Sequence, residues 1–143
     1  MNTLPRPALP LSQRVRGLNW TLVGVLTAVA LVRPLFSVAG LSDVLGKPAT
    51  PLILTAGISL TWILVVGLRR DLEPLLTLIA AGVVYALAVT VLSAILSPLI
   101  LGRLEGPLAR PYAIVPLLLT HIMWGAVCGA LALAVRSLRG TAD

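Results

Sequence analysis

The sequence predicts an all-α integral membrane protein in which four apolar helices form one bundle from two antiparallel hairpins, with both termini in the cytoplasm. Three observations lead to this fold class. The mean hydropathy is +1.02, and 58% of the residues are hydrophobic while 11% are charged, far from the averages of a soluble domain. Four long apolar stretches hold 97 of the 143 residues, and a helix needs about 20 residues to cross a bilayer core. These stretches contain no Asp or Glu.

The lengths of the stretches define the elements. The predicted spans are residues 17–41, 51–68, 74–102 and 111–135. The last three contain 18, 29 and 25 residues, with His121 as the one side chain that can become a cation. The first is less uniform, because 16 uncharged residues are followed by Arg33-Pro34 and then by an apolar continuation. The connections are short, which predicts that neighbouring helices run antiparallel.

The segments outside the spans are small. Residues 1–16 form a basic, proline-rich tail that is too short to fold alone, and we expect it to rest on anionic lipid headgroups. Residues 17–143 then form a single transmembrane domain. The first span imitates a secretory signal, with basic residues before an apolar run and the small residues Ser37 and Ala39 after it. Because Arg33 and Pro34 interrupt that run, we expect the segment to be retained as a span.

The net charge of +6 has an explanation in topology and requires no nucleic acid. With the N-terminus inside, seven arginines fall in cytoplasmic segments and three basic residues fall outside, which follows the positive-inside rule. The cytoplasmic set is Arg6, Arg14, Arg16, Arg69, Arg70, Arg136 and Arg139, and the outer set is Lys47, Arg103 and Arg110. Ten Arg against one Lys indicates a GC-rich coding bias. We therefore expect the cytoplasmic membrane of a bacterium as the location.

Arg33 is the sharpest local feature of the first span. Pro34 cannot donate a hydrogen bond to the carbonyl of Ala30, so the helix should kink there and leave an acceptor free. Counted from Gly17, Arg33 lies about 24 Å up, near the outer rim of a core of roughly 30 Å. Two interpretations remain open: an arginine that reaches to lipid phosphates, or an anion-binding or gating residue at the mouth of an outward cavity.

His121 lies deeper, about 15 Å from Pro111 and close to the midplane. On the same face of its helix stand Gly125, Cys128 and Ala132, at helical spacing. Gly125 and Gly129 form a GxxxG pair, which lets another backbone approach closely. The third span offers a matching stripe of small residues, Gly82, Ala86, Thr90 and Ala94. We therefore expect the third and fourth helices to pack through these stripes, with His121 facing the bundle.

Tyr85 falls at a similar depth on the third span, about 17 Å from Pro74, within reach of His121. One interpretation is mutual satisfaction of polar groups inside the membrane. The other is a small polar cavity lined by Arg33, Tyr85, His121 and Trp124. Hydroxyls in the second and third spans could join either arrangement, namely Thr55, Ser59, Thr61, Thr90, Ser93 and Ser97. A metal or haem site is disfavoured, because His121 and Cys128 alone cannot fill a coordination shell.

Missing motifs narrow the function further. No span carries a carboxylate, which disfavours ion-coupled exchange through a buried Glu, paired-Asp intramembrane proteolysis and carboxylate-bridged metals. The sequence also lacks GxSxG, CxxC, P-loop and GxGxxG motifs. We expect no enzymatic activity, no cofactor and no metal.

Two segments carry a resemblance. The run from His121 to Gly129 (HIMWGAVCG) and the run from Leu31 to Ser37 (LVRPLFS) resemble small four-helix membrane proteins of GC-rich bacteria. That resemblance could cover the whole chain and implies the fold class. It implies no activity, substrate or site residues.

Three functional hypotheses follow. The first is a small multi-pass protein that binds or passes a ligand through an intramembrane polar patch around Arg33, Tyr85, His121 and Trp124. The second is a structural or accessory subunit of a larger membrane complex, in which the small-residue stripes contact a partner helix. The third is a homodimer that holds a cofactor between two copies of His121. Membrane lipids are the expected partners in each case, with a second copy or another membrane protein where the hypothesis requires one.

Overall fold

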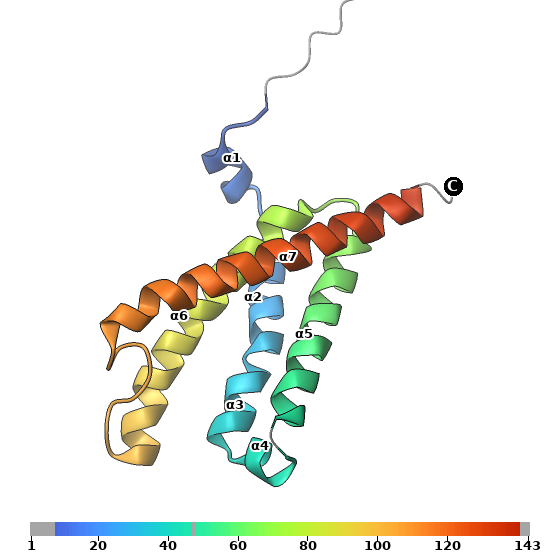
Figure 1. Cartoon of the computed structure of the whole chain (residues 1–143). Helices are drawn as coiled ribbons and strands as arrows, with labels where there is room; N and C mark the ends of the chain where they lie inside the picture. Colours follow the sequence, from blue (N-terminus) through green and yellow to red (C-terminus); the bar gives the residue numbers. More distant parts are fainter. Residues whose placement is uncertain (1–7, 47, 141–143) are drawn as a thin grey trace, which may run out of the picture.

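The computed structural model describes residues 8–46 and 48–140, and every regular element in them is helical (Figure 1). The elements are α1 (Leu11–Arg16), α2 (Trp20–Ala30), α3 (Val32–Val38), α4 (Leu41–Val44), α5 (Ala49–Gly67), α6 (Pro74–Leu101), the 3-10 turn η1 (Pro111–Ala113) and α7 (Ile114–Gly140). Four helical segments of the described residues are long and apolar enough to cross a membrane: Trp20–Val38, Ala49–Gly67, Pro74–Leu101 and Pro111–Gly140. Arg6 and Lys47, which entered the charge count, lie outside the described residues.

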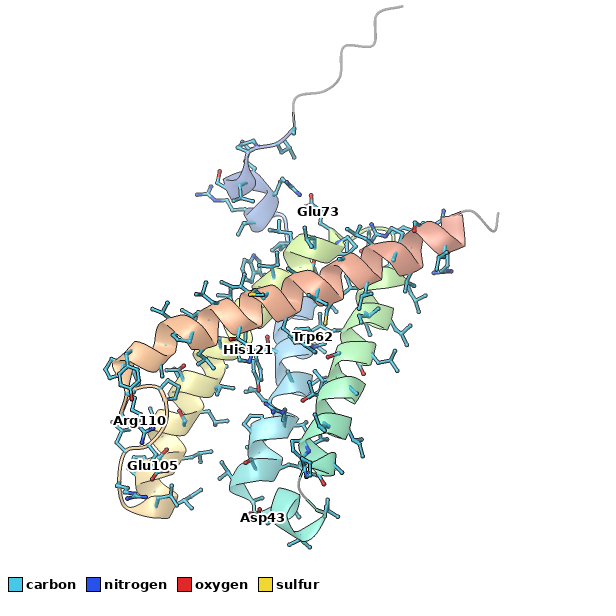
Figure 2. All side chains as sticks on the ribbon, in the orientation of Figure 1. Asp43, Trp62, Glu73, Glu105, Arg110 and His121 are labelled. Carbon is cyan, nitrogen blue, oxygen red and sulfur yellow. The ribbon has the colours of Figure 1, made fainter. Side chains whose placement is uncertain are left out.

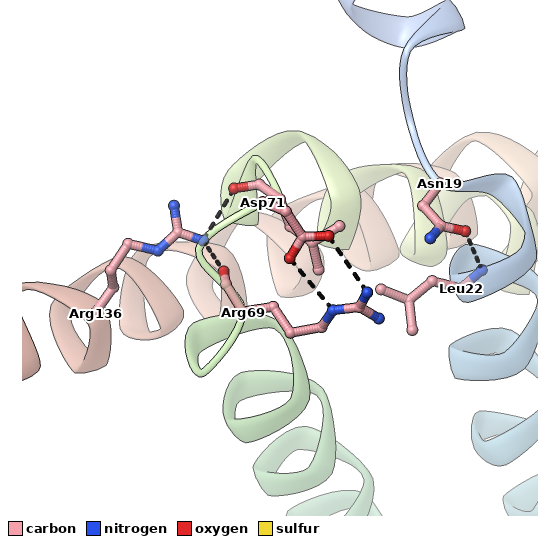
Figure 3. A network of polar contacts seen from close by, with 6 residues as sticks. Asn19, Leu22, Arg69, Asp71 and Arg136 are labelled. Carbon is pink, nitrogen blue, oxygen red and sulfur yellow. Dashed lines mark hydrogen bonds and ion pairs between the residues drawn. The ribbon is translucent and has the colours of Figure 1, made fainter.

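The first apolar segment is two helices with a break at Leu31. α2 begins after Asn19, whose side-chain oxygen accepts a hydrogen bond from the Leu22 amide at 3.0 Å (Figure 3), so the cap satisfies a free amide of the first turn. α2 ends at Ala30, and α3 begins at Val32. Pro34 has no amide hydrogen for the Ala30 carbonyl, which accounts for a break one turn earlier in the chain.

The other three long helices differ from the expected spans mainly at their ends. α5 and α6 begin and end within two residues of the predicted 51–68 and 74–102. Pro74 occupies the first turn of α6, where its missing amide hydrogen costs nothing, and Gly102 ends it with a left-handed φ of 69°. α7 continues to Gly140, five residues beyond the predicted 135.

The N-terminal tail is more ordered than expected, because residues 11–16 form α1. The Arg14 guanidinium binds Glu73, which precedes α6, with Nη2 2.6 Å from Oε2 and Nε 3.1 Å from the same oxygen. Both side chains are exposed. The short helix α1 is therefore held by an ion pair with a residue 59 positions later in the chain.

α6 and α7 make the closest helix contact, at their glycines. A Cβ added at Gly82 would collide with the His121 carbonyl, and one at Gly125 would collide with the Leu78 carbonyl. At Gly129 it would lie 2.7 Å from the Leu75 Cα. These residues let the two backbones touch, as small residues do between membrane helices. Ala86, from the same small stripe of α6, is also buried.

The core lies where α2, α5, α6 and α7 meet. Val66, Leu78, Ala81 and Ala132 are fully buried there. Trp62 of α5 is 3% exposed, and its indole Nε1 donates to the Leu26 carbonyl of α2 at 3.0 Å. α7 crosses α2 and α5 obliquely instead of lying alongside them (Figure 1).

The connection from α5 to α6 is fixed by an arginine of α7 (Figure 3). Arg136 Nη2 donates to the carbonyls of Arg69 and Leu72 at 2.5 and 2.9 Å. Arg139 donates to the Leu68 carbonyl at 3.3 Å. These carbonyls follow the last turn of α5, where the helix offers them no amide partner. The arginines of α7 therefore bind the α5–α6 connection through its backbone.

Candidate functional site

The four residues singled out from the sequence line one cavity of about 240 Å³. Arg33 comes from α3, Tyr85 from α6, and His121 and Trp124 from α7. Side chains of α5 complete the wall, chiefly Thr55, Ser59 and Trp62. Figure 2 shows His121 of α7 directed toward the space beside α2, with Trp62 of α5 nearby. Residues of α2, α3, α5, α6 and α7 thus contribute to one site.

The aromatic rings of Tyr85 and His121 are in contact. The ring centroids are 4.9 Å apart and the ring planes are tilted by 43°. No hydrogen bond joins these two side chains among the interactions of the described residues. Tyr85 is 7% exposed, whereas His121 is half-buried. The buried tyrosine therefore provides the surface on which the imidazole rests.

The hydrogen bond of His121 fixes its tautomer. Nδ1 lies 2.7 Å from the carbonyl oxygen of Leu117, one turn earlier in α7. A carbonyl only accepts, so Nδ1 must carry the proton of this hydrogen bond. In the neutral ring Nε2 is then an acceptor, and within residues 8–46 and 48–140 it has no protein partner. The site thus offers one imidazole acceptor.

Arg33 is exposed at the edge of the cavity and interacts with the Tyr85 hydroxyl. The helices α2, α3, α5, α6 and α7 contain no Asp or Glu, while α4, which packs against α3, contributes Asp43. No ion pair of the described residues includes Arg33. A guanidinium remains protonated under all ordinary conditions. The site consequently carries one positive charge that forms no ion pair within the described residues.

Trp124 closes the cavity against α5. Its indole Nε1 donates to the Ser59 hydroxyl oxygen at 3.0 Å, and Ser59 in turn donates to the Thr55 carbonyl at 2.8 Å. Trp124 is 46% exposed, so one edge of the indole faces away from the protein. The donors of this wall are therefore already used within the protein.

Sequence reasoning missed Trp62 as a site residue and treated Thr55 and Ser59 only as general polar partners. A usable signal was present, because Thr55, Ser59 and Trp62 follow the i, i+4, i+7 spacing of one helical face. The pattern could not tell which face of α5 turns inward, because apolar residues occur on every side of the helix and Thr61 places a hydroxyl on another face. That orientation came from the contact between Trp62 and Leu26.

The described residues contain no group of three or more His, Cys, Asp or Glu side chains that could hold a metal ion. Cys128 is a buried free thiol beside Ser59. The third hypothesis would thus need ligands from a second copy of the chain.

Comparison with known proteins returns no matching family model, no matching curated protein and no matching solved structure. The resemblance to small four-helix membrane proteins stays an expectation from the sequence.

Proposed function

We propose that this chain is a small multi-pass protein of a bacterial cytoplasmic membrane that binds or passes a ligand through the cavity between Arg33, Tyr85, His121 and Trp124. The observation that carries this proposal is the convergence of the few polar side chains of four apolar helices on one cavity. Polar groups in a hydrocarbon solvent are costly and are usually found where function requires them.

The proposed placement has both termini in the cytoplasm. α1, the α5–α6 connection and the C-terminal end of α7 lie toward one end of the molecule, whereas α4 and the 102–110 connection lie toward the other (Figure 1). Arg14, Arg69, Arg136 and Arg139 lie at the first end. The positive-inside rule supports assigning that end to the cytoplasm.

The contacts in the site support ligand binding over mutual satisfaction of polar groups. If the groups only satisfied one another, Arg33 would be neutralised and His121 Nε2 would have a donor. Instead, Arg33 forms no ion pair within the described residues, and His121 Nε2 has no hydrogen-bond partner among them. A ligand with an anionic group and a donor would complement both.

Thermal unfolding of the purified protein in mild detergent tests the proposal. A panel of small anions, organic acids and neutral solutes is added to the protein and to its Arg33→Ala and His121→Ala variants. We expect at least one ligand to raise the melting temperature of the protein, and both variants to lose that rise. Arg110→Ala is the control, because Arg110 lies in the outer connection away from the cavity. The proposal fails if no ligand raises the melting temperature, or if the variants respond as the protein does.

A second function, an accessory subunit of a larger complex, is favoured by one observation. Gly24 of α2 and Gly57 of α5 have nothing within 4 Å of the position that a Cβ would take, so the backbone of a partner helix could approach there. Purification in a mild detergent separates the two proposals. A stoichiometric foreign protein supports the subunit, and a monomer or homodimer that binds ligand supports the first proposal.

A further inference from the structure

The cavity continues into a groove between α3 and α6. A neighbouring cavity of about 330 Å³ shares Arg33, Tyr85 and His121 with it. A third, of about 250 Å³, shares Ser37 and Val38 with the second. The three form a continuous series from Trp62 to the end of α6, and Arg33 lies at the junction of the first two.

The walls differ in chemistry along this series. In the groove, Ser93 donates to the Thr90 carbonyl at 3.0 Å, and Ser97 donates to the Glu105 carbonyl at 3.1 Å. Their hydroxyl protons are therefore engaged by the backbone, and the rest of the wall is mostly aliphatic. Among the residues that line the groove, Arg33 is the one charged side chain. At its inner end stand the cation of Arg33 and the acceptor of His121.

The inner cavity, which is the one bordered by Trp62 and Trp124, is partly open to the surface, and its volume limits the size of an occupant. It is about 240 Å³ and is bordered by Trp62, Trp124 and Ile58. A buried apolar cavity of about 150 Å³ is enough to hold a benzene molecule. The inner cavity therefore has room for one ring or a short aliphatic chain, together with a head group.

We infer that the ligand of this site is a small organic monoanion whose compact apolar body lies against Trp62 and Trp124 while its acidic head pairs with Arg33. This inference rests on the proposed function and names its ligand class. Charge complementarity carries it, because Arg33 forms no ion pair with any described residue. An aromatic acid and a medium-chain fatty acid share this chemistry.

Tryptophan fluorescence provides the test, because brominated compounds quench indoles at short range. The Trp20→Phe variant leaves Trp62 and Trp124 as reporters beside the cavity. It is titrated in detergent with 4-bromobenzoate and 8-bromooctanoate, and with 4-bromobenzyl alcohol and 8-bromooctanol as neutral counterparts. We expect saturable quenching by one or both acids, and only weak, non-saturating quenching by the alcohols. The acid whose quenching saturates shows whether the apolar body of the ligand is an aromatic ring or an aliphatic chain.

Two variants with matched controls locate the binding. The Arg33→Gln substitution should weaken the binding of the acid that gave saturable quenching by about 10-fold or more, as expected for loss of a hydrogen-bonded charge partner. The Arg110→Gln substitution should leave this binding unchanged. Thr120→Phe places a ring in the cavity from an exposed position of α7 and should abolish saturable quenching. Val127→Phe, on the same helix but 52% exposed and outside these cavities, should leave it intact. The second pair keeps the inference falsifiable if Arg33→Gln does not fold.

Other results overturn the inference. Equal saturable quenching by acids and alcohols would remove the role of the charge. Tighter binding of 16-bromohexadecanoate than of 8-bromooctanoate would indicate a lipid chain lying in the groove. Absence of saturable binding by either acid, with another ligand raising the melting temperature through Arg33 and His121, would overturn the ligand class and leave the proposed function standing. Failure of every ligand would overturn both.

Discussion

The imidazole of His121 rests on the ring of Tyr85 with 4.9 Å between ring centroids, and this contact joins α7 to α6 at the candidate site. The same imidazole donates from Nδ1 to the Leu117 carbonyl, so both its position and its tautomer are set within the protein. His121 also lines the cavity, and its Nε2 has no hydrogen-bond partner among the described residues.

His121→Ala removes the ring contact and should lower the free energy of unfolding by about 1–3 kcal/mol. His121→Phe keeps a ring against Tyr85 but loses the donor, so we expect a smaller loss of about 1 kcal/mol. Denaturant titration in mild detergent measures both. Met123→Ala, at a position of α7 that is 67% exposed, controls for truncation and should change stability little. Equal stability of the Ala variant and the protein would show that the contact contributes nothing.

Because α6 and α7 approach closely, replacing a glycine at their contact should affect stability much more than replacing a glycine elsewhere. Gly125→Ala would place a methyl group against the Leu78 backbone, with the carbonyl carbon 2.9 Å away, so the helices must separate. We expect a loss of at least 2 kcal/mol, within the range of about 1–3 kcal/mol or more for overpacking. Gly57→Ala, in open space within α5, should be neutral or stabilising by up to about 1 kcal/mol because alanine favours helix. Similar effects of the two substitutions in the same unfolding assay would contradict the contact.

The ion pair between Arg14 and Glu73 makes the attachment of α1 dependent on pH. Hydrogen bonds from Arg14, ahead of its charge attraction, hold the pKa of the Glu73 carboxyl below its ordinary value. Because the pKa of Glu73 is lower in the folded protein, the ion pair stabilises the attachment of α1 fully at pH values above the ordinary pKa of a glutamate. This stabilisation is lost as the pH falls through the lowered pKa. Hydrogen exchange of residues 11–18 should therefore accelerate in acid. The Glu73→Gln variant should show fast exchange of these residues already at pH 7. An equal exchange rate in the variant and the unsubstituted protein would contradict the ion pair.

Trp62→Phe removes the indole donor to the Leu26 carbonyl while keeping an aromatic ring in the core. We expect a loss of about 1–2 kcal/mol, typical of a buried hydrogen bond with one partner removed. Trp20→Phe is the matched control, because Trp20 is 48% exposed at the start of α2. The same denaturant titration compares them, and a larger effect at Trp20 would contradict the assigned core.

The four long apolar helices could be predicted from the sequence because uninterrupted apolar runs set their length and proline and glycine mark their ends. Pro74 and Gly102, for example, mark the two ends of α6 almost where the sequence predicts them. Glycine spacing likewise indicated the faces of α6 and α7 that carry Gly82 and Gly125. What could not be predicted depends on partners distant in the chain. α1 is held by Glu73, and the inward face of α5 is set by Trp62 binding Leu26. The oblique course of α7 follows from packing and has no signal in hydropathy.

The most direct test of the central claim is a crystal structure of the protein grown from a lipidic phase, with the map inspected between α3, α6 and α7. We expect Arg33, Tyr85, His121 and Trp124 to line one cavity, with non-protein density against the guanidinium. A structure in which the imidazole of His121 faces acyl chains without Tyr85 beside it, and Arg33 lies on another face of the molecule, would contradict the claim.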